Sequence, residues 1–275
     1  MGTQEEPAQV EPALSVDAPA PAPRPLRPLG AKRAWWIFCA YVGTQLVVGI
    51  FVGLSAGILY GALHGFAGGG STKDLQRLVF IPAALLALLG AGFVVQRMAR
   101  SSFSGASGRE AFAAIGWRAA GTRQVISAGL TGMLLALVFL TIISRIFPPP
   151  DPAKWGPMVR AIAGGGWRLY LWALVALVAA PLVEEFVFRG VLFEGFSRAW
   201  GAIPAAVVVT GLFALMHFTE AWAYPPALVT IAILGVLAIV VRVRSQSLVP
   251  AIALHACYNL GIVLASVASA GAQRS

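Results

Sequence analysis

The chain has 275 residues, of which 58% are hydrophobic and 11% charged, and its mean hydropathy is +0.79. This composition excludes a soluble globular protein and indicates a multi-pass membrane protein. The net charge of +9 does not favour a nucleic-acid partner, because the Lys and Arg residues lie in short segments between apolar stretches, where they set membrane orientation.

The first 31 residues differ in composition from the rest of the chain. They have no apolar periodicity and repeat Pro and Ala, most clearly over residues 18–24. Such a segment cannot bury enough apolar surface to offset the entropy lost on folding. We therefore expect a disordered cytoplasmic tail over residues 1–31, and its acidic, Pro-rich character does not fit a signal peptide.

Seven apolar stretches are long enough to cross about 30 Å of hydrocarbon as helices, which takes roughly 17 to 25 residues. They lie at residues 34–62, 78–96, 125–146, 168–188, 203–222, 226–241 and 248–269. The sequence thus predicts an all-α, multi-pass transmembrane bundle of about seven helices. We divide it into N-terminal membrane helices with a basic loop, residues 32–160, and a region that carries polar motifs, residues 161–275.

Most of the 20 Lys and Arg residues fall on the side of the predicted bundle that holds the N-terminus. They lie in the tail, in the loop over residues 96–123, and in two later connections. Cytoplasmic connections carry an excess of Lys and Arg, so we expect a protein of the cell membrane with a cytoplasmic N-terminus. The basic loop is typical of a solvated surface beside lipid headgroups, which makes the bilayer the first partner.

Glycines recur at every fourth position of the first span, at Gly49, Gly53, Gly57, Gly61 and Gly65. This spacing places small residues along one face of a helix, where another helix can approach closely. Packing within the chain is the favoured interpretation. A homodimer through Gly49, Gly53, Gly57 and Gly61 is the alternative.

Three charged residues, Glu184, Glu185 and Arg189, end an uncharged apolar run over residues 169–180. Charges beside hydrocarbon are costly, and an ionisable residue inside a membrane is a functional hypothesis by default. Glu185 and Arg189 lie four apart on one helix face and can pair. Glu184, rotated by about 100°, is left free, and a carboxylate without a cation can serve as a general base.

Two histidines and an asparagine follow on later spans. His217 lies in the fifth span, while His255 and Asn259 lie four apart on one face of the seventh. If a turn at Gly201 joins antiparallel helices, Glu184 and His217 each lie about 16 residues, or roughly 24 Å, from it and meet at one height. His255 lies at a comparable depth, so we expect these groups to converge in the cytoplasmic half of the bundle.

Each of these residues also has a structural interpretation. A single intramembrane His is usually a hydrogen-bonded packing residue, and Asn259 alone would join two helices. Glu185 and Arg189 fit an ion pair that positions their helix better than a reacting pair. Only the convergence of all six favours catalysis or proton handling over packing, and composition does not separate those two.

The motifs Glu184-Glu185-x-x-x-Arg189, Phe213-x-x-x-His217 and His255-x-x-x-Asn259 resemble, in this order, those of the CPBP intramembrane proteases. This family includes type II CAAX prenyl endopeptidases and bacterial abortive-infection proteins, and the resemblance covers residues 165–270. It implies an endopeptidase in which Glu184 and His217 activate water, while His255 and Asn259 stabilise the oxyanion. Glu185 and Arg189 would fix the helix that presents Glu184. The substrate would be a peptide or protein, with a prenylated C-terminus as one alternative.

The motifs do not decide whether the reaction uses a metal ion. A Glu and two His residues could hold zinc with one open position, and the family has been described as metalloproteases. The sequence has no His-Glu-x-x-His motif, and Cys39 and Cys257 lie in apolar runs without a CxxC partner. We favour a metal-independent glutamate mechanism with no cofactor, and zinc remains the alternative.

Two functions of other classes fit the same residues. In a proton-coupled transporter, carboxylates and histidines would relay protons. The chain shows no internal repeat, which argues against this alternative. The second is a non-catalytic membrane adaptor or immunity protein that binds a partner through the glycine strip.

Overall fold

The computed structural model describes residues 29–64, 72–103, 106–150 and 166–272. Within these ranges the chain is helical and has no β-strand. The predicted all-α, multi-pass bundle is therefore confirmed. Of the predicted tail, residues 1–28 lie outside the described residues. The first helix begins at Ala31.

The N-terminal half consists of a helical hairpin, a short helix and a third long helix. The hairpin pairs α1 (Ala31–His64) with α2 (Thr72–Ser101), and the short helix is α3 (Gly108–Ala114). The third long helix comprises α4 (Thr122–Val138), the π-helix η1 (Phe139–Ile143) and α5 (Ser144–Ile146).

The C-terminal half starts with one continuous helix of 34 residues, Trp167–Trp200. Its parts are α7 (Trp167–Leu174), the π-helix η3 (Val175–Ala179), α8 (Ala180–Glu185), the π-helix η4 (Phe186–Leu192) and α9 (Phe193–Trp200). The remaining helices are α10 (Ala202–Met216), α11 (Phe218–Ala221), α12 (Pro225–Ser245) and α13 (Val249–Ala272).

Six helices of the described chain are long and apolar enough to cross a membrane, and they match six of the seven predicted spans. The seventh, predicted at residues 203–222, is divided. Its main helix, α10, has 15 residues and ends before His217, whose backbone (φ −97°, ψ 1°) leaves the helical region. A helix of this length is about 22 Å long, less than a hydrocarbon core of about 30 Å. By length alone, α10 enters the membrane without crossing it.

Two π-helices flank α8, the segment that carries Glu184 and Glu185. A proline inside a regular α-helix lacks an N–H and clashes with the carbonyl four residues earlier. The wider turns of η3 directly before Pro181 accommodate this residue, so the helix continues to Trp200. Gly201 then adopts φ +86°, which favours glycine, and turns the chain into α10 as predicted.

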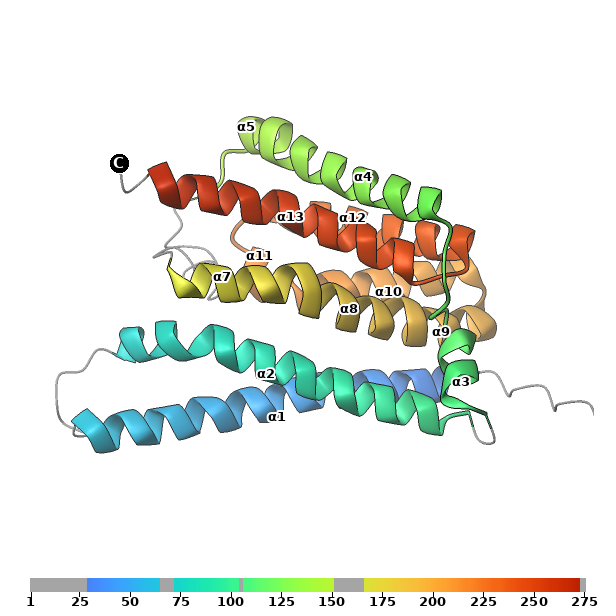
Figure 1. Ribbon diagram of the computed structural model, residues 1–275, viewed down its shortest axis with the longest axis horizontal. Helices are drawn as coiled ribbons and strands as arrows, with labels where there is room; N and C mark the ends of the chain where they lie inside the picture. The colour runs from blue at the N-terminus through green and yellow to red at the C-terminus, as the bar shows by residue number, and fades with distance from the viewer. Residues whose placement is uncertain (1–28, 65–71, 104–105, 151–165, 273–275) are drawn as a thin grey trace, which may run out of the picture.

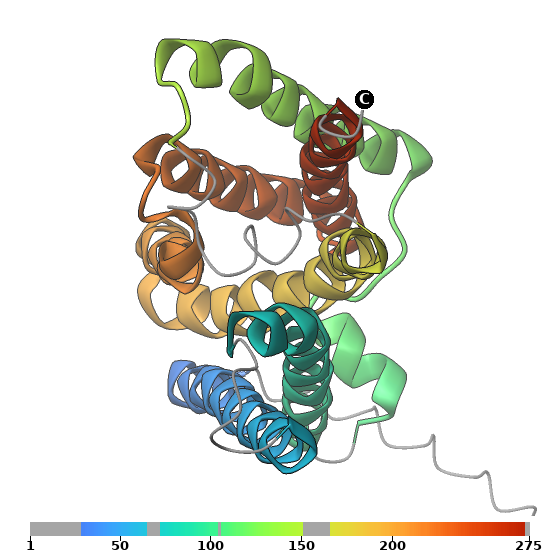
Figure 2. The ribbon, with the colours of Figure 1, turned by 90° about the vertical axis from the view of Figure 1, so that its left-hand side faces the viewer.

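The helices form layers around the site (Figures 1 and 2). The helix from α7 to α9 lies in the middle together with α10, the α1–α2 hairpin packs on one side, and α12, α13 and α4 follow on the other. A Cβ at Gly132 of α4 would clash with the backbone oxygen of Leu254, so α4 and α13 approach as closely as a glycine permits. This contact holds the part of α13 that carries His255.

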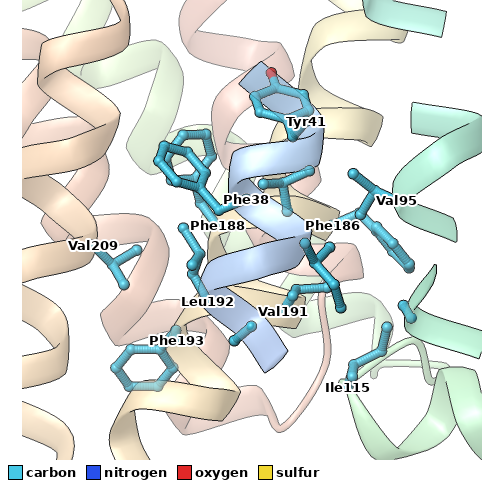
Figure 3. Packing of buried hydrophobic residues seen from close by; sticks show 14 of the residues in the cluster. Phe38, Tyr41, Val95, Ile115, Phe186, Phe188, Val191, Leu192, Phe193 and Val209 are labelled. Carbon is cyan, nitrogen blue, oxygen red and sulfur yellow. The ribbon is translucent and has the colours of Figure 1, made fainter. Parts of the chain in front are cut away.

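The core lies where α1, η4 and α10 meet, and Figure 3 shows its packing. Phe38 and Phe188 contact edge to face with ring centroids 5.8 Å apart, and Phe188 and Phe213 do so at 5.2 Å. The outward faces of the long helices carry exposed Leu, Ile, Val and Phe side chains, as expected for surfaces in contact with lipid.

The glycine strip of α1 is not filled by close contacts in the structure. No described atom lies within 4 Å of a Cβ built at Gly49, Gly53 or Gly57, and Gly65 lies outside the described residues. Gly49 and Gly53 line a groove against Val79 of α2. Helix α1 thus packs along α2 within the chain, as the favoured interpretation expects, but without close contacts at these three positions, and the homodimer stays a prediction.

Candidate active site

Glu184, His217 and His255 come from three separate helices and meet at one point. The Oε2 atom of Glu184 lies 3.9 Å from Nε2 of His217 and 4.0 Å from Nε2 of His255. The exposed side-chain fraction is 29% for His217, 14% for Glu184 and 4% for His255. The site therefore opens beside His217 and closes at His255, with the carboxylate between them.

The break in the helix after α10 sets the orientation of His217. Because α10 ends at Met216, the imidazole of His217 folds back along its own helix, and Nδ1 lies 2.9 Å from the backbone oxygen of Phe213. A carbonyl oxygen can only accept a hydrogen bond, so Nδ1 carries the proton in this contact. In the neutral ring, Nε2 then presents a lone pair toward Glu184.

His255 is held by a chain of buried charges. Its Nδ1 donates to Oε1 of Glu185 over 2.9 Å, and Nη1 of Arg189 donates to the same oxygen over 3.0 Å. Both Glu185 and Arg189 are fully buried. A second nitrogen of Arg189, Nη2, donates to the backbone oxygen of Gly235 over 3.0 Å. The predicted Glu185–Arg189 pair thus exists, and through Glu185 it also orients a histidine of another helix.

Phe213 and Gly235 belong to this arrangement, although no pattern in the sequence assigns either residue a role. The guanidinium carbon of Arg189 lies 4.4 Å from the centroid of the Phe213 ring, which also contacts the rings of His217 and His255. A Cβ at Gly235 would lie 3.5 Å from Nη2 of Arg189. The only signal for Phe213 was its place at the start of the second motif, and Gly235 had none.

Asn259 lies one turn beyond His255 on α13, and its amide is already engaged. Its Nδ2 donates to the backbone oxygen of Ala176 over 2.7 Å. Ala176 belongs to the π-helix η3, where the regular α-helical hydrogen-bonding pattern is interrupted. Asn259 therefore joins α13 to the helix that carries Glu184, and the second hydrogen of its amide remains for another acceptor.

Residues 166–261 match the family model described as type II CAAX prenyl endopeptidase Rce1-like. This region belongs to the Rce1-like family. The predicted relation to the CPBP intramembrane proteases is thereby confirmed, and the match supports, at the level of the family, a protease that acts in a membrane. No curated protein and no solved structure matches the chain.

The Rce1-like region contains all six predicted site residues. It runs from the start of α7 into the middle of α13, so α1, α2 and α4 lie outside it. These three helices nevertheless enclose the Rce1-like region on two sides (Figure 2). The site is therefore built within the Rce1-like region and covered by helices that the family match does not include.

The spacing of the site residues bears on whether they could hold a metal ion. Among the residues that the structure describes, no group of three His, Cys, Asp or Glu side chains is arranged to hold an ion. Zinc ligands bind at about 2.0–2.2 Å and His ligands usually donate their second N–H to a supporting acceptor. His217 and His255 have such acceptors, but their Nε2 atoms lie about 4 Å from the Glu184 oxygen, wider than a shared tetrahedral ion requires.

Proposed function

We propose that the protein is an intramembrane endopeptidase in which Glu184 activates water for attack on a peptide bond. The observation that carries this proposal is the placement of one Glu184 oxygen between the Nε2 atoms of His217 and His255. The gaps of 3.9 and 4.0 Å suit a water molecule that hydrogen-bonds to both sides at about 2.8 Å.

In the first step, Glu184 removes a proton from this water while the lone pair of His217 Nε2 accepts its second hydrogen. The resulting hydroxide forms a bond to the carbonyl carbon of the substrate, and the carbonyl π electrons move to its oxygen. In the second step, the C–N bond breaks, and Glu184 returns the proton to the leaving amine. Water is consumed, and a carboxylic acid and an amine are released.

The oxyanion of the intermediate needs donors, and His255 supplies the first. Its Nδ1–H is held by the buried carboxylate of Glu185, much as an aspartate orients the histidine of a serine-protease triad. When Nε2 also carries a proton, it donates to the oxyanion. The free hydrogen of the Asn259 amide is the second donor, while its other hydrogen stays on Ala176.

The same proposal places the protein in the cell membrane with its N-terminus in the cytoplasm. Basic residues gather at the end of the bundle where α1 begins, α2 ends and α12 meets α13. They are Lys32, Arg33, Arg97, Arg100, Arg242 and Arg244. Because this is the distribution that the positive-inside rule expects for a cytoplasmic face, substrates would reach Glu184 from that side.

Purified protein in liposomes tests the proposal with an internally quenched peptide that ends in a farnesylated Cys-aliphatic-aliphatic-X sequence. We expect cleavage that continues unchanged in the presence of a strong chelator, because the mechanism uses no metal, and no proton flux across the liposome membrane. Loss of cleavage with the chelator and its return with zinc would contradict the metal-independent mechanism. Proton flux that depends on Glu184, without cleavage, would support a transporter instead.

A further inference from the structure

Helix α1 lies outside the Rce1-like region, yet it packs along the helix that carries Glu184. Trp35 stacks on Phe196 at a centroid distance of 6.5 Å, and Tyr41 contacts Phe188 edge to face at 6.3 Å. As residue numbers rise on α1 they fall on its partner, so the two helices run in opposite directions (Figure 1).

This register places Gln45 at the level of Glu184. Gln45 follows Tyr41 by four residues, and Glu184 precedes Phe188 by four, so each lies one helical turn further in the same direction. Gln45 also follows the exposed Trp36 by nine residues, about 13 Å along the helix axis. Since exposed tryptophans favour the membrane interface, Gln45 lies within the hydrocarbon, in the same half as the site.

The polar groups at this level of α1 are incompletely paired. Tyr41 is 2% exposed, and Figure 3 shows its hydroxyl pointing away from Phe38 and Phe188. Gln45 lies one helical turn after Tyr41, on the same face of α1. Within the described chain, the buried Nε2 atom of Gln45 and the buried Oε2 atom of Glu184 have no hydrogen-bond partner.

An unpaired amide donor is costly at this depth, since lipid offers it no acceptor. A substrate segment that enters the site brings unpaired acceptors, because its peptide carbonyl groups lose their hydrogen bonds to water and require new donors. The carboxamide of glutamine has one donor group and one acceptor group, as a peptide bond does. The free donor at the level of Glu184 is thus complementary to an extended polypeptide.

We propose that Gln45 and Tyr41 form a substrate-binding subsite in which the Gln45 amide donates to a main-chain carbonyl next to the bond that Glu184 attacks. Tyr41 holds the Gln45 side chain in place. The ligand class is an unfolded, extended peptide segment. This inference rests on the proposed protease function, and it makes α1 part of the enzyme although the family match begins only at residue 166.

The test replaces Gln45 with Met, which keeps the length of the side chain and removes its hydrogen-bonding groups. The probe is the farnesylated, internally quenched peptide. Its KM and kcat are measured with intact protein, and its Kd is measured in a Glu184→Gln background, where no cleavage takes place. We expect Gln45→Met to raise KM and Kd by about 5- to 150-fold, the effect of an unpaired buried polar group, with kcat nearly unchanged.

Thr44→Val is the matched control, because it also removes a polar group from α1, but from a side chain that faces Gly90 of α2. It should leave KM and Kd at the wild-type values. Thermal unfolding separates binding from folding, because replacing an unpaired buried amide by Met should not lower the unfolding temperature.

The outcomes separate this inference from the protease function itself. Cleavage by the wild type that requires Glu184, with unchanged KM and Kd in Gln45→Met, would contradict the subsite and leave the protease function standing. A loss confined to kcat would place Gln45 on the attacking water instead, and a lower unfolding temperature would assign it a structural role. Absence of Glu184-dependent cleavage by the wild type would contradict the protease function.

Discussion

Glu184→Gln should lower the rate of peptide cleavage by about 10²- to 10⁴-fold, the usual contribution of a general base. The substitution keeps the shape of the side chain, so the packing of α8 against α13 and α10 should not change. Glutamine cannot take the proton of a water molecule, and the step at Glu184 is lost while the oxyanion donors remain. Initial rates in liposomes and thermal unfolding of the purified variants provide the measurement.

Glu194→Gln is the control for this prediction. Glu194 lies on the same continuous helix, and its carboxylate pairs with Arg198 at 2.7 Å and with Arg242 at 3.6 Å. This group is remote from the two histidines in the structure, so its substitution should leave the cleavage rate within a few-fold of the wild type. A Glu184→Gln variant that cleaves as fast as Glu194→Gln would show that Glu184 is not the base.

Arg189→Met should lower the free energy of unfolding by about 3–5 kcal/mol, because it removes the guanidinium that pairs with the buried carboxylate of Glu185. Both side chains of the pair are fully buried, so water cannot take the place of the guanidinium. The double substitution Glu185→Gln with Arg189→Met removes both charges and should recover most of the lost stability. Thermal unfolding in detergent measures both effects.

The cleavage rate should not follow stability in this pair of variants. In the double variant an amide replaces the carboxylate beside Nδ1 of His255, so the protonated ring loses its counter-charge and the oxyanion donor weakens. We expect the double variant to be stable but slow. If Arg189→Met unfolds at the wild-type temperature, the buried pair does not stabilise the fold. If the double variant keeps full activity, Glu185 does not support His255.

Hydropathy and helix geometry were sufficient to predict the architecture and the meeting of the polar residues. The continuous helix to Trp200, the turn at Gly201 and the Glu185–Arg189 pair all follow from rise per residue and spacing. Each of these three features depends on residues that are close in the sequence or lie on one helix. A single sequence is therefore enough to predict them.

The remaining features depend on how helices pack sideways, which hydropathy does not describe. The apolar stretch at residues 203–222 does not reveal that the helix ends before His217, because apolar residues continue on both sides of the break. The contact of Gly132 with Leu254 depends on two surfaces that are far apart in the sequence. Gln45 lies inside an apolar span, and only the register of α1 against Phe188 places it at the level of Glu184.

The protease function is tested most directly by comparing protein termini in cells that contain the intact protein with those in cells that contain Glu184→Gln. Terminal proteomics of the membrane fraction should reveal new carboxyl termini that occur only with the intact protein, from membrane-associated proteins cut near the cytoplasmic face. Identical sets of termini in the two cell populations, at equal amounts of the two proteins, would contradict a hydrolase built on Glu184, His217 and His255.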